Sequence, residues 1–269
     1  MKVFEVLPSE LIFMASYLGA DEFFGLQNPF FGMSEKETQS ALADAQSSLA
    51  EKKYASLDFD GNFTPVESIE LMSEVCSHCD SYITVDVMEK GIEQAPVRFY
   101  FLDNYTVRLS GTDMLRLELV SSDEIEAELL DLSDKYAPHT CDISQEPFLI
   151  PLSTLAKAQL VSDELEKQRE YLTELKCPDI FTEILVSGFK RETNYCAVTL
   201  VDFTTKKVDS VICLQSGDKT LRMVSIKEND VNCWELSLMD SSVMKNALSI
   251  MIKDPLEQLK EGGDDDALS

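Results

Sequence analysis

The chain has 269 residues, and its 44% hydrophobic content is enough for a sizeable core in one or two domains. Its 23 basic and 49 acidic side chains give a formal net charge of −26. This charge argues against nucleic acid and against the anionic cytoplasmic face of a membrane as partners, because Lys and Arg supply most of the affinity for both. A basic or amphipathic protein partner is compatible with it.

Neither a targeting segment nor a membrane-spanning segment is expected. The apolar stretch 11–20 is short, and Glu5 and Glu10 stand where a secretory leader carries positive charge. No run approaches the roughly 18–20 apolar residues that cross a bilayer. Seven cysteines in irregular spacing are typical of a reduced compartment rather than of a disulfide framework. These features predict a cytoplasmic protein.

The first half of the chain predicts helices followed by strands. Ser9 is a candidate N-cap, Ser34 forms a candidate capping box with Glu37, and a third helix starts at a proline. These helices are expected at Ser9–Leu18, Ser34–Lys53 and Pro65–Cys76. Alternating apolar residues then predict four antiparallel strands at Tyr82–Met88, Val97–Leu102, Tyr105–Ser110 and Leu115–Val120. A helix capped by Ser122 closes this half.

The same order of elements returns after a proline-containing loop at 138–151. Helical spacing over Ser153–Lys176 predicts one long or broken helix, and a short helix begins at Pro178. Four strands and one helix are expected to follow, at Tyr195–Phe203, Val208–Leu214, Thr220–Ile226, Cys233–Met239 and Ser241–Ile252. Residues 256–269, with paired glycines and three consecutive aspartates, predict a flexible acidic tail.

The two halves also match residue by residue. Constant shifts of 113 and 119 residues superpose Pro65 on Pro178, Tyr82 on Tyr195, Leu117 on Leu236 and Ser122 on Ser241. Apolar positions of two amphipathic segments agree easily by chance, whereas proline, serine and tyrosine matches are harder to obtain that way. We therefore expect an internal duplication in a single domain, 1–255, whose halves (about 1–135 and 150–255) share one sheet around a pseudo-two-fold axis.

One segment has the spacing of a calcium-binding loop. Ser56–Glu67 places oxygen-bearing side chains at positions one, three and five, Gly61 at position six and Glu67 at position twelve. However, the first position holds a neutral Ser56, and no second loop of this kind occurs. The alternative is an ordinary turn with Gly61 at positive φ. We predict no tight calcium site here.

A zinc site is the second metal hypothesis. Cys76, Cys79, His139 and Cys141 could together supply four ligands, but H-x-C is a poor half-site. Cys76 also lies on the apolar face of its predicted helix, where a thiol packs as a small hydrophobic group. We predict no tight zinc site, and no cofactor.

Motifs for catalysis are absent from the sequence. The chain has two histidines, and it lacks a G-x-S-x-G elbow, a P-loop and a G-x-G-x-x-G sequence. A carboxylate pair would occur by chance among 49 acidic residues, so it carries no signal. The sequence therefore predicts a binding protein rather than an enzyme.

The order of features in the N-terminal half resembles a known family. The features are a short strand Val3–Val6, a Leu-rich helix Ser9–Leu18, an apolar loop with Gly25, Pro29 and Gly32, a long Ala/Leu/Glu helix over Ala41–Glu51, a turn at Gly61, a Pro-started helix Pro65–Val75 and a long strand Tyr82–Val87. In this order the chain resembles the EspG family of type VII secretion chaperones. The resemblance implies an α+β fold with a pseudo-two-fold duplication, in which helical bundles flank a central antiparallel sheet.

The resemblance also implies a function and a site. The chain would be a cytosolic chaperone that keeps a secreted helical-hairpin protein soluble. Its richness in Lys, Ser and Glu resembles systems of low-GC Gram-positive bacteria, whose cargo would be of the LXG or WXG type. The cargo tip would meet the loop after the first long strand and the C-terminal helices, here Gly91, Ile92, Glu93 and Gln94 together with Met244 and Leu248. Two alternatives for these residues are that Ile92 folds back on the sheet and that Met244 and Leu248 belong to the core.

Two other classes of function are compatible with the sequence. One is an immunity protein that neutralises a secreted toxin by direct binding, which would also be acidic and without catalytic motifs. The other is a hydrolase with a calcium- or zinc-dependent fold, which metal analysis would test.

Overall fold

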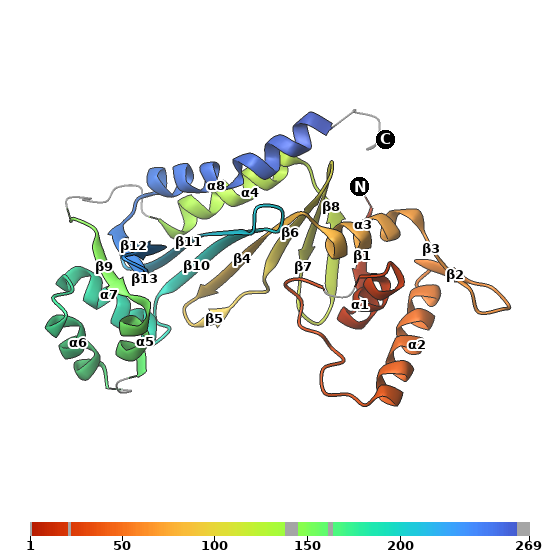
Figure 1. Ribbon diagram of the computed structural model, residues 1–269, viewed down its shortest axis with the longest axis horizontal. Helices are drawn as coiled ribbons and strands as arrows, with labels where there is room; N and C mark the ends of the chain where they lie inside the picture. The colour runs from red at the N-terminus through yellow and green to blue at the C-terminus, as the bar shows by residue number, and fades with distance from the viewer. Residues whose placement is uncertain (1, 21–22, 138–144, 161–163, 263–269) are drawn as a thin grey trace.

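One long antiparallel sheet forms the centre of the protein (Figure 1). The computed structural model describes residues 2–20, 23–137, 145–160 and 164–262. From one edge to the other, the strands are β1 (Val3–Val6), β8 (Leu115–Leu119), β7 (Tyr105–Ser110), β6 (Val97–Leu102), β4 (Ser81–Glu89), β10 (Asn194–Asp202), β11 (Lys207–Ser216), β12 (Lys219–Glu228), β13 (Val231–Leu238) and β9 (Phe148–Pro151). The short β5 (Ile92–Glu93) pairs with the end of β4, and β2 (Ala55–Leu57) and β3 (Phe63–Pro65) form a separate hairpin.

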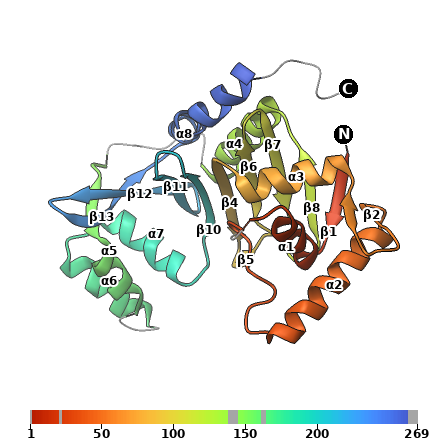
Figure 2. The same ribbon diagram turned by 45° about the vertical axis from the view of Figure 1, so that its right-hand side comes forward.

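Helices cover both faces of the sheet. They are α1 (Pro8–Tyr17), α2 (Glu35–Glu51), α3 (Glu67–His78), α4 (Ser122–Tyr136), α5 (Leu152–Leu160), α6 (Leu165–Glu174), α7 (Asp179–Phe189) and α8 (Ser241–Gly262). Helices α4 and α8 lie across one face, whereas α1–α3 and α5–α7 lie at opposite ends of the other face (Figures 1 and 2). This mixed arrangement confirms the α+β class and the flanked antiparallel sheet that the sequence predicts.

The alternation of side chains along the strands produces three cores. In β4, the buried Ile83 and Val85 face α4 and α8, while Tyr82 and Thr84 face the other side and are half-buried. A second core forms under α1–α3 and a third under α5–α7. The core between the sheet and α4/α8 takes residues from both halves of the chain, including Val85 and Val198.

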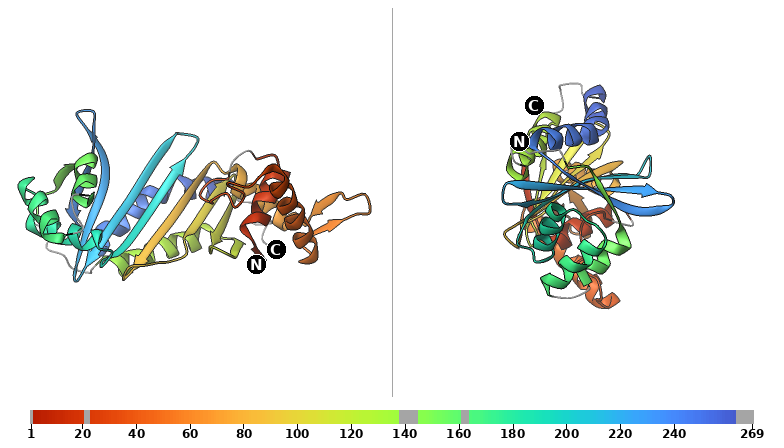
Figure 3. Two further views of the ribbon diagram at one scale, coloured as in Figure 1. Left: turned by 90° about the horizontal axis from the view of Figure 1, so that it is seen from below. Right: turned by 90° about the vertical axis from the view of Figure 1, so that its left-hand side faces the viewer.

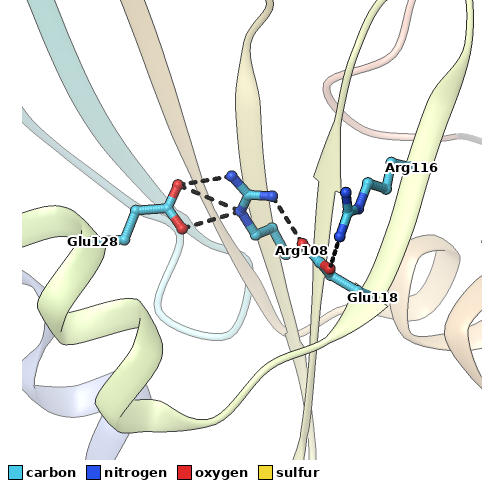
Figure 4. Close-up of polar contacts among 4 residues, drawn as sticks. All are labelled: Arg108, Arg116, Glu118 and Glu128. Atoms are coloured by element: carbon cyan, nitrogen blue, oxygen red, sulfur yellow. Dashed lines mark hydrogen bonds and ion pairs between the residues drawn. The ribbon is translucent and has the colours of Figure 1, made fainter. Parts of the chain in front are cut away.

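A network of charged side chains ties α4 to the sheet at β7 and β8 (Figure 4). Arg108 on β7 donates to both carboxylate oxygens of Glu128 on α4, with its Nε 3.0 Å from Oε2 and its Nη2 3.0 Å from Oε1. Its Nη1 donates to Oε1 of Glu118 on β8 at 2.8 Å. Arg116 binds the other oxygen of Glu118 at 3.0 Å. Bidentate contacts of this kind fix the orientation of α4 relative to the sheet and also stabilise its packing against the sheet.

The helix starts follow the predicted caps with small shifts. Ser34 caps α2 and forms the predicted box with Glu37, whose carboxylate accepts from the Ser34 N–H at 2.8 Å. Helix α1 starts at Pro8 with Leu7 as its N-cap, two residues before the predicted cap Ser9. Helix α4 starts at Ser122 with Ser121 as its N-cap, one residue before the predicted cap. Pro65 is the last residue of β3 rather than the first residue of a helix. It pairs with Ala55 across the β2–β3 hairpin, and α3 starts only at Glu67.

The C-terminal half departs from the predicted elements in two places. The Ser153–Lys176 segment forms two helices, α5 and α6, which agrees with the broken helix that the sequence allows. The loop before it contains the edge strand β9, which pairs with β13. Helix α8 passes through Pro255 and ends at Gly262, and Leu256 is buried. Residues 256–262 are therefore helical rather than part of a flexible tail, and 263–269 lie outside the described residues.

The sheet has the same order of elements on each side of the β4–β10 pair. The series β4-β6-β7-β8-β1 on one side corresponds to β10-β11-β12-β13-β9 on the other. Val85 pairs directly with Val198, and the 113-residue shift superposes these two residues. If a two-fold axis relates the halves, equivalent residues of the two central strands must pair with each other at the axis. That the halves arose by duplication stays a prediction.

Candidate functional site

The candidate site is the tight hairpin that joins β4 to β5. Glu89 pairs with Ile92, so Lys90 and Gly91 are the two turn residues, and both have positive φ, 51° and 79°. Two positive φ angles define the turn type that matches the twist of antiparallel strands. A side chain at Gly91 would meet the carbonyl oxygen of Arg191 at 3.1 Å. Glycine is thus favoured at this position both by its backbone conformation and by this close approach.

Contacts from two sides hold the hairpin in place. Tyr136 at the end of α4 donates its hydroxyl to Glu89 at 2.7 Å, and Lys135 forms an ion pair with the same carboxylate. The hydrogen bond from Lys135, followed by that from Tyr136, lowers the pKa of Glu89. On the other side, the Lys90 N–H donates to Oδ1 of Asn194 at 3.2 Å.

The predicted residues Gly91, Ile92, Glu93 and Gln94 lie together on this hairpin. The Ile92 side chain is 67% exposed, so it does not fold back on the sheet. Arg191 forms an ion pair with the exposed Glu93 at 3.2 Å, and the Gln94 N–H donates to Val87 at 2.9 Å. The hairpin therefore presents one large apolar side chain on a turn whose backbone is fixed.

The other two predicted contact residues belong to the core. Met244 and Leu248 are both fully buried between α8, α4 and the sheet, where they pack with Ile125 and Leu129. In this structure neither side chain can touch a partner, and the structure does not bring them together with the hairpin. This part of the predicted site is therefore corrected, because α4 covers the stripe of α8 that carries both residues.

The uncovered face of the central strands is a feature that the sequence analysis missed. Among the described residues, no helix covers the face of β4 and β10 opposite to α4 and α8, as Figure 3 (left) shows. Polar side chains lie on it: Thr84 donates to Asp86 at 3.2 Å, and the hydroxyls of Thr199 and Ser210 are 3.0 Å apart. The sequence of β4 contains a signal for this face, because Thr84 and Asp86 alternate with apolar residues. Polar residues at every second position of an otherwise apolar strand indicate a solvated face.

The calcium-like loop is the tip of the β2–β3 hairpin, which projects from the molecule in Figure 3. Asp58 accepts hydrogen bonds from the N–H groups of Asp60 and Asn62, both at 2.9 Å, and from Nδ2 of Asn62 at 2.7 Å. The Asn62 side chain contributes most to lowering the pKa of Asp58. Gly61 has a φ of 81°, as an ordinary turn requires. A calcium-binding loop also places glycine at this position, so the absence of a tight calcium site stays a prediction.

The proposed zinc ligands are described only in part. Cys76 and Cys79 are buried, and burial raises the pKa of the Cys79 thiol to about 12. His139 and Cys141 lie outside the described residues. Over the part of the chain that the structure describes, no group of three or more His, Cys, Asp or Glu side chains could hold a metal ion. Among the same residues, no helix has both the length and the apolar composition to cross a bilayer.

Comparison with known proteins finds a match in structure but not in sequence. No protein-family model matches the chain, and neither does any curated protein sequence. The fold is similar to that of EspG5. This type VII secretion chaperone of Mycobacterium tuberculosis was solved in complex with a PE25–PPE41 dimer. The alignment covers 97% of this chain and 98% of that chain, with a TM-score of 0.61 and 9% sequence identity. At this identity the likeness establishes the fold.

Proposed function

We propose that this protein is a cytosolic chaperone of a type VII secretion system, which binds a helical-hairpin substrate and keeps it soluble before export. The observation that carries the proposal is the similarity to EspG5 over nearly the full length of both chains. The substrate that we propose is of the LXG or WXG type. Such hairpins expose an apolar end, which self-associates unless a partner covers it.

The β4–β5 hairpin supports a specific role in this binding. Ile92 is a large apolar side chain presented on a turn that Asn194 and Tyr136 hold in position. A preorganised anchor loses little conformational entropy when it binds, so more of its contact energy appears as affinity. We infer that Ile92 enters an apolar pocket at the tip of the substrate, and that Glu93 and Gln94 form the polar rim.

The test begins with purification of the tagged chain from its native host and identification of the bound protein. The affinity for that protein is then measured by calorimetry for the wild type and for Ile92→Asp. We expect Ile92→Asp to weaken binding by about thirtyfold, which corresponds to roughly 2 kcal/mol for a central anchor. Circular dichroism verifies that the variant is folded.

Ile250→Asp is the matched control, because Ile250 on α8 has the same 67% exposure as Ile92. It should bind the substrate like the wild type. Equal affinity of Ile92→Asp and the wild type would remove the hairpin as the site. Recovery of a toxin domain in place of a helical-hairpin secreted protein would replace the chaperone function with that of an immunity protein.

A further inference from the structure

A cleft of about 540 Å³ lies between α1, α2 and the loop that joins them. It is far in the sequence from the β4–β5 hairpin, and no residue of that hairpin lines it. Its walls are mostly apolar: Ile12 and Ala15 come from α1, Leu42 from α2, and Phe23 and Phe30 from the loop. The volume lies in the range of sites that bury several apolar groups of a ligand.

The described part of the loop that lines the cleft is fixed to the sheet at Phe24 and Gly25. Tyr100 on β6 donates its hydroxyl to the Phe24 carbonyl at 2.7 Å, and the Phe24 ring lies 4.3 Å from that of Phe203. Gly25 has a φ of 74°, and a side chain there would meet Arg98 at 2.9 Å. These contacts form the cleft before any partner arrives, so binding does not have to order this wall.

The two helices line the cleft with residues at helical spacing. Ile12, Ala15 and Ser16 are three and four residues apart on α1, and Thr38 and Leu42 are four apart on α2. Small side chains on α1 allow the backbone of a third helix to approach closely. The lining residues of α1 and α2 therefore form the two sides of a groove. An amphipathic helix fills such a groove with apolar residues at i, i+3, i+4 and i+7.

The charge around the cleft selects the polar flanks of such a helix. Helix α2 carries four exposed acidic side chains, Glu35, Glu37, Asp44 and Glu51, and a single basic one, Lys36. The one charged side chain of α1, Glu10, is buried and paired with Lys52. A second copy of this chain would bring another net charge of −26 and is disfavoured, whereas Lys or Arg beside an apolar stripe is attracted.

We propose that the cleft between α1 and α2 binds an amphipathic α-helix of another protein, in which Lys or Arg flanks the apolar stripe. The site is additional to the hairpin surface and does not depend on the proposed chaperone function. The probe is a fluorescein-labelled peptide of Leu and Lys, roughly 15 residues long so that it can form a helix, with leucines at i, i+3, i+4 and i+7. Binding is followed by fluorescence anisotropy at about 0.15 M salt, where surface charge is screened beyond about 8 Å.

We expect saturable binding that Ser16→Trp weakens at least about tenfold, because the indole fills the cleft. Ser40→Trp is the matched control: both serines are exposed, but Ser40 does not line the cleft. A peptide of the same composition with its leucines dispersed should also bind about tenfold more weakly. Thr38→Trp replaces Ser16→Trp if circular dichroism shows that the latter is unfolded.

Two results would overturn the proposal. Equal affinity for the two peptides would mean that net charge alone attracts them. Equal affinity of Ser40→Trp and both cleft variants would mean that the peptide binds elsewhere.

Discussion

Arg108 joins three elements through one guanidinium group, and its surroundings make that contact costly to lose. Its side chain is 23% exposed and that of Glu118 only 12%. Burial acts to lower the pKa of Arg108, but the hydrogen bonds and charges of Glu128 and Glu118 outweigh it, so the pKa is raised. The cation is thus held by its partners. Removing it leaves Glu118 with Arg116 alone and Glu128 without its two-pronged contact.

We predict that Arg108→Ala lowers the free energy of unfolding by roughly 1–3 kcal/mol, measured by urea denaturation. The substitution leaves partly buried carboxylates without the cation that compensates their charge. Arg116→Ala is the control within the same network, since the Arg116 side chain is 54% exposed. It should change the free energy by less than about 0.5 kcal/mol. Equal effects of the two substitutions would show that Arg108 contributes only as a surface charge.

At the scale of residues, the sequence left both parts of the predicted site open. Ile92 follows Gly91 in a polar turn, and local chemistry allowed either an exposed anchor or a side chain folded back on the sheet; the structure shows the side chain exposed. For Met244 and Leu248, helical spacing shows that they share a stripe but not which surface covers it. The answer depends on α4, which lies more than a hundred residues away in the chain. The sequence analysis retained the core as an alternative for these two residues, and the structure supports it.

The start of α4 illustrates how a single element depends on charge. Ser121 donates its N–H and its hydroxyl to Glu124, both at 2.8 Å. The backbone hydrogen bond, followed by that of the hydroxyl, lowers the pKa of Glu124 below its ordinary value of 4.5. A carboxylate whose pKa is lower in the folded than in the unfolded state stabilises the fold above the unfolded value. That contribution is lost as the pH falls through the folded pKa.

We therefore predict that Glu124→Gln lowers stability at pH 7 by roughly 0.3–1 kcal/mol, the usual effect of an anion near a helix N-terminus. The difference from the wild type should shrink as the pH falls below about 4.5, where the wild-type carboxyl becomes neutral as well. Urea midpoints at pH 7 and at about pH 3.5 measure it. Asp131→Asn, later on the same helix, should not lower stability at pH 7. A difference for Glu124→Gln that is independent of pH would contradict the role of charge in this cap.

Long strands with their own sequence period were predicted more closely than the ends of helices. Strands β6 and β7 have the predicted bounds, because their alternating side chains and the short connection between them are local signals. The hairpin β2–β3 and the edge strand β9 were missed. These strands have three or four residues each, too few to show a period. Pairing with β13 stabilises β9, and this contact is not visible in the segment itself.

At the scale of the whole molecule, the relation between the halves was predicted from identical residues at constant shifts. The order of the strands on each side of β4 and β10 agrees with that prediction, and so does the direct pairing of Val85 with Val198. We propose that the halves arose by duplication. The sequence could not show how they join, because antiparallel pairing of the two central strands depends on contacts across more than a hundred residues.

The two halves should unfold as one unit, because they share both the sheet and a core. Strand β4 pairs with β10 from Ser81 to Met88, and the core under α4 and α8 contains side chains from each half. Opening one half would expose apolar surface of the other, which favours a cooperative transition. Trp234 on β13 is the single tryptophan of the chain and reports on the C-terminal half alone. Far-UV circular dichroism reports on both halves.

We predict that the two signals give the same urea midpoint and the same slope, within the precision of the measurement. Tryptophan fluorescence that changes at a lower urea concentration than the circular dichroism would mean that the C-terminal half opens first. The shared core would then contribute less than the two outer cores beneath α1–α3 and α5–α7. A Val198→Ala variant distinguishes these cases further, since Val198 is fully buried at the centre of the β4–β10 pair. It should lower both midpoints together, because the cavity that it leaves lies in the core that both halves share.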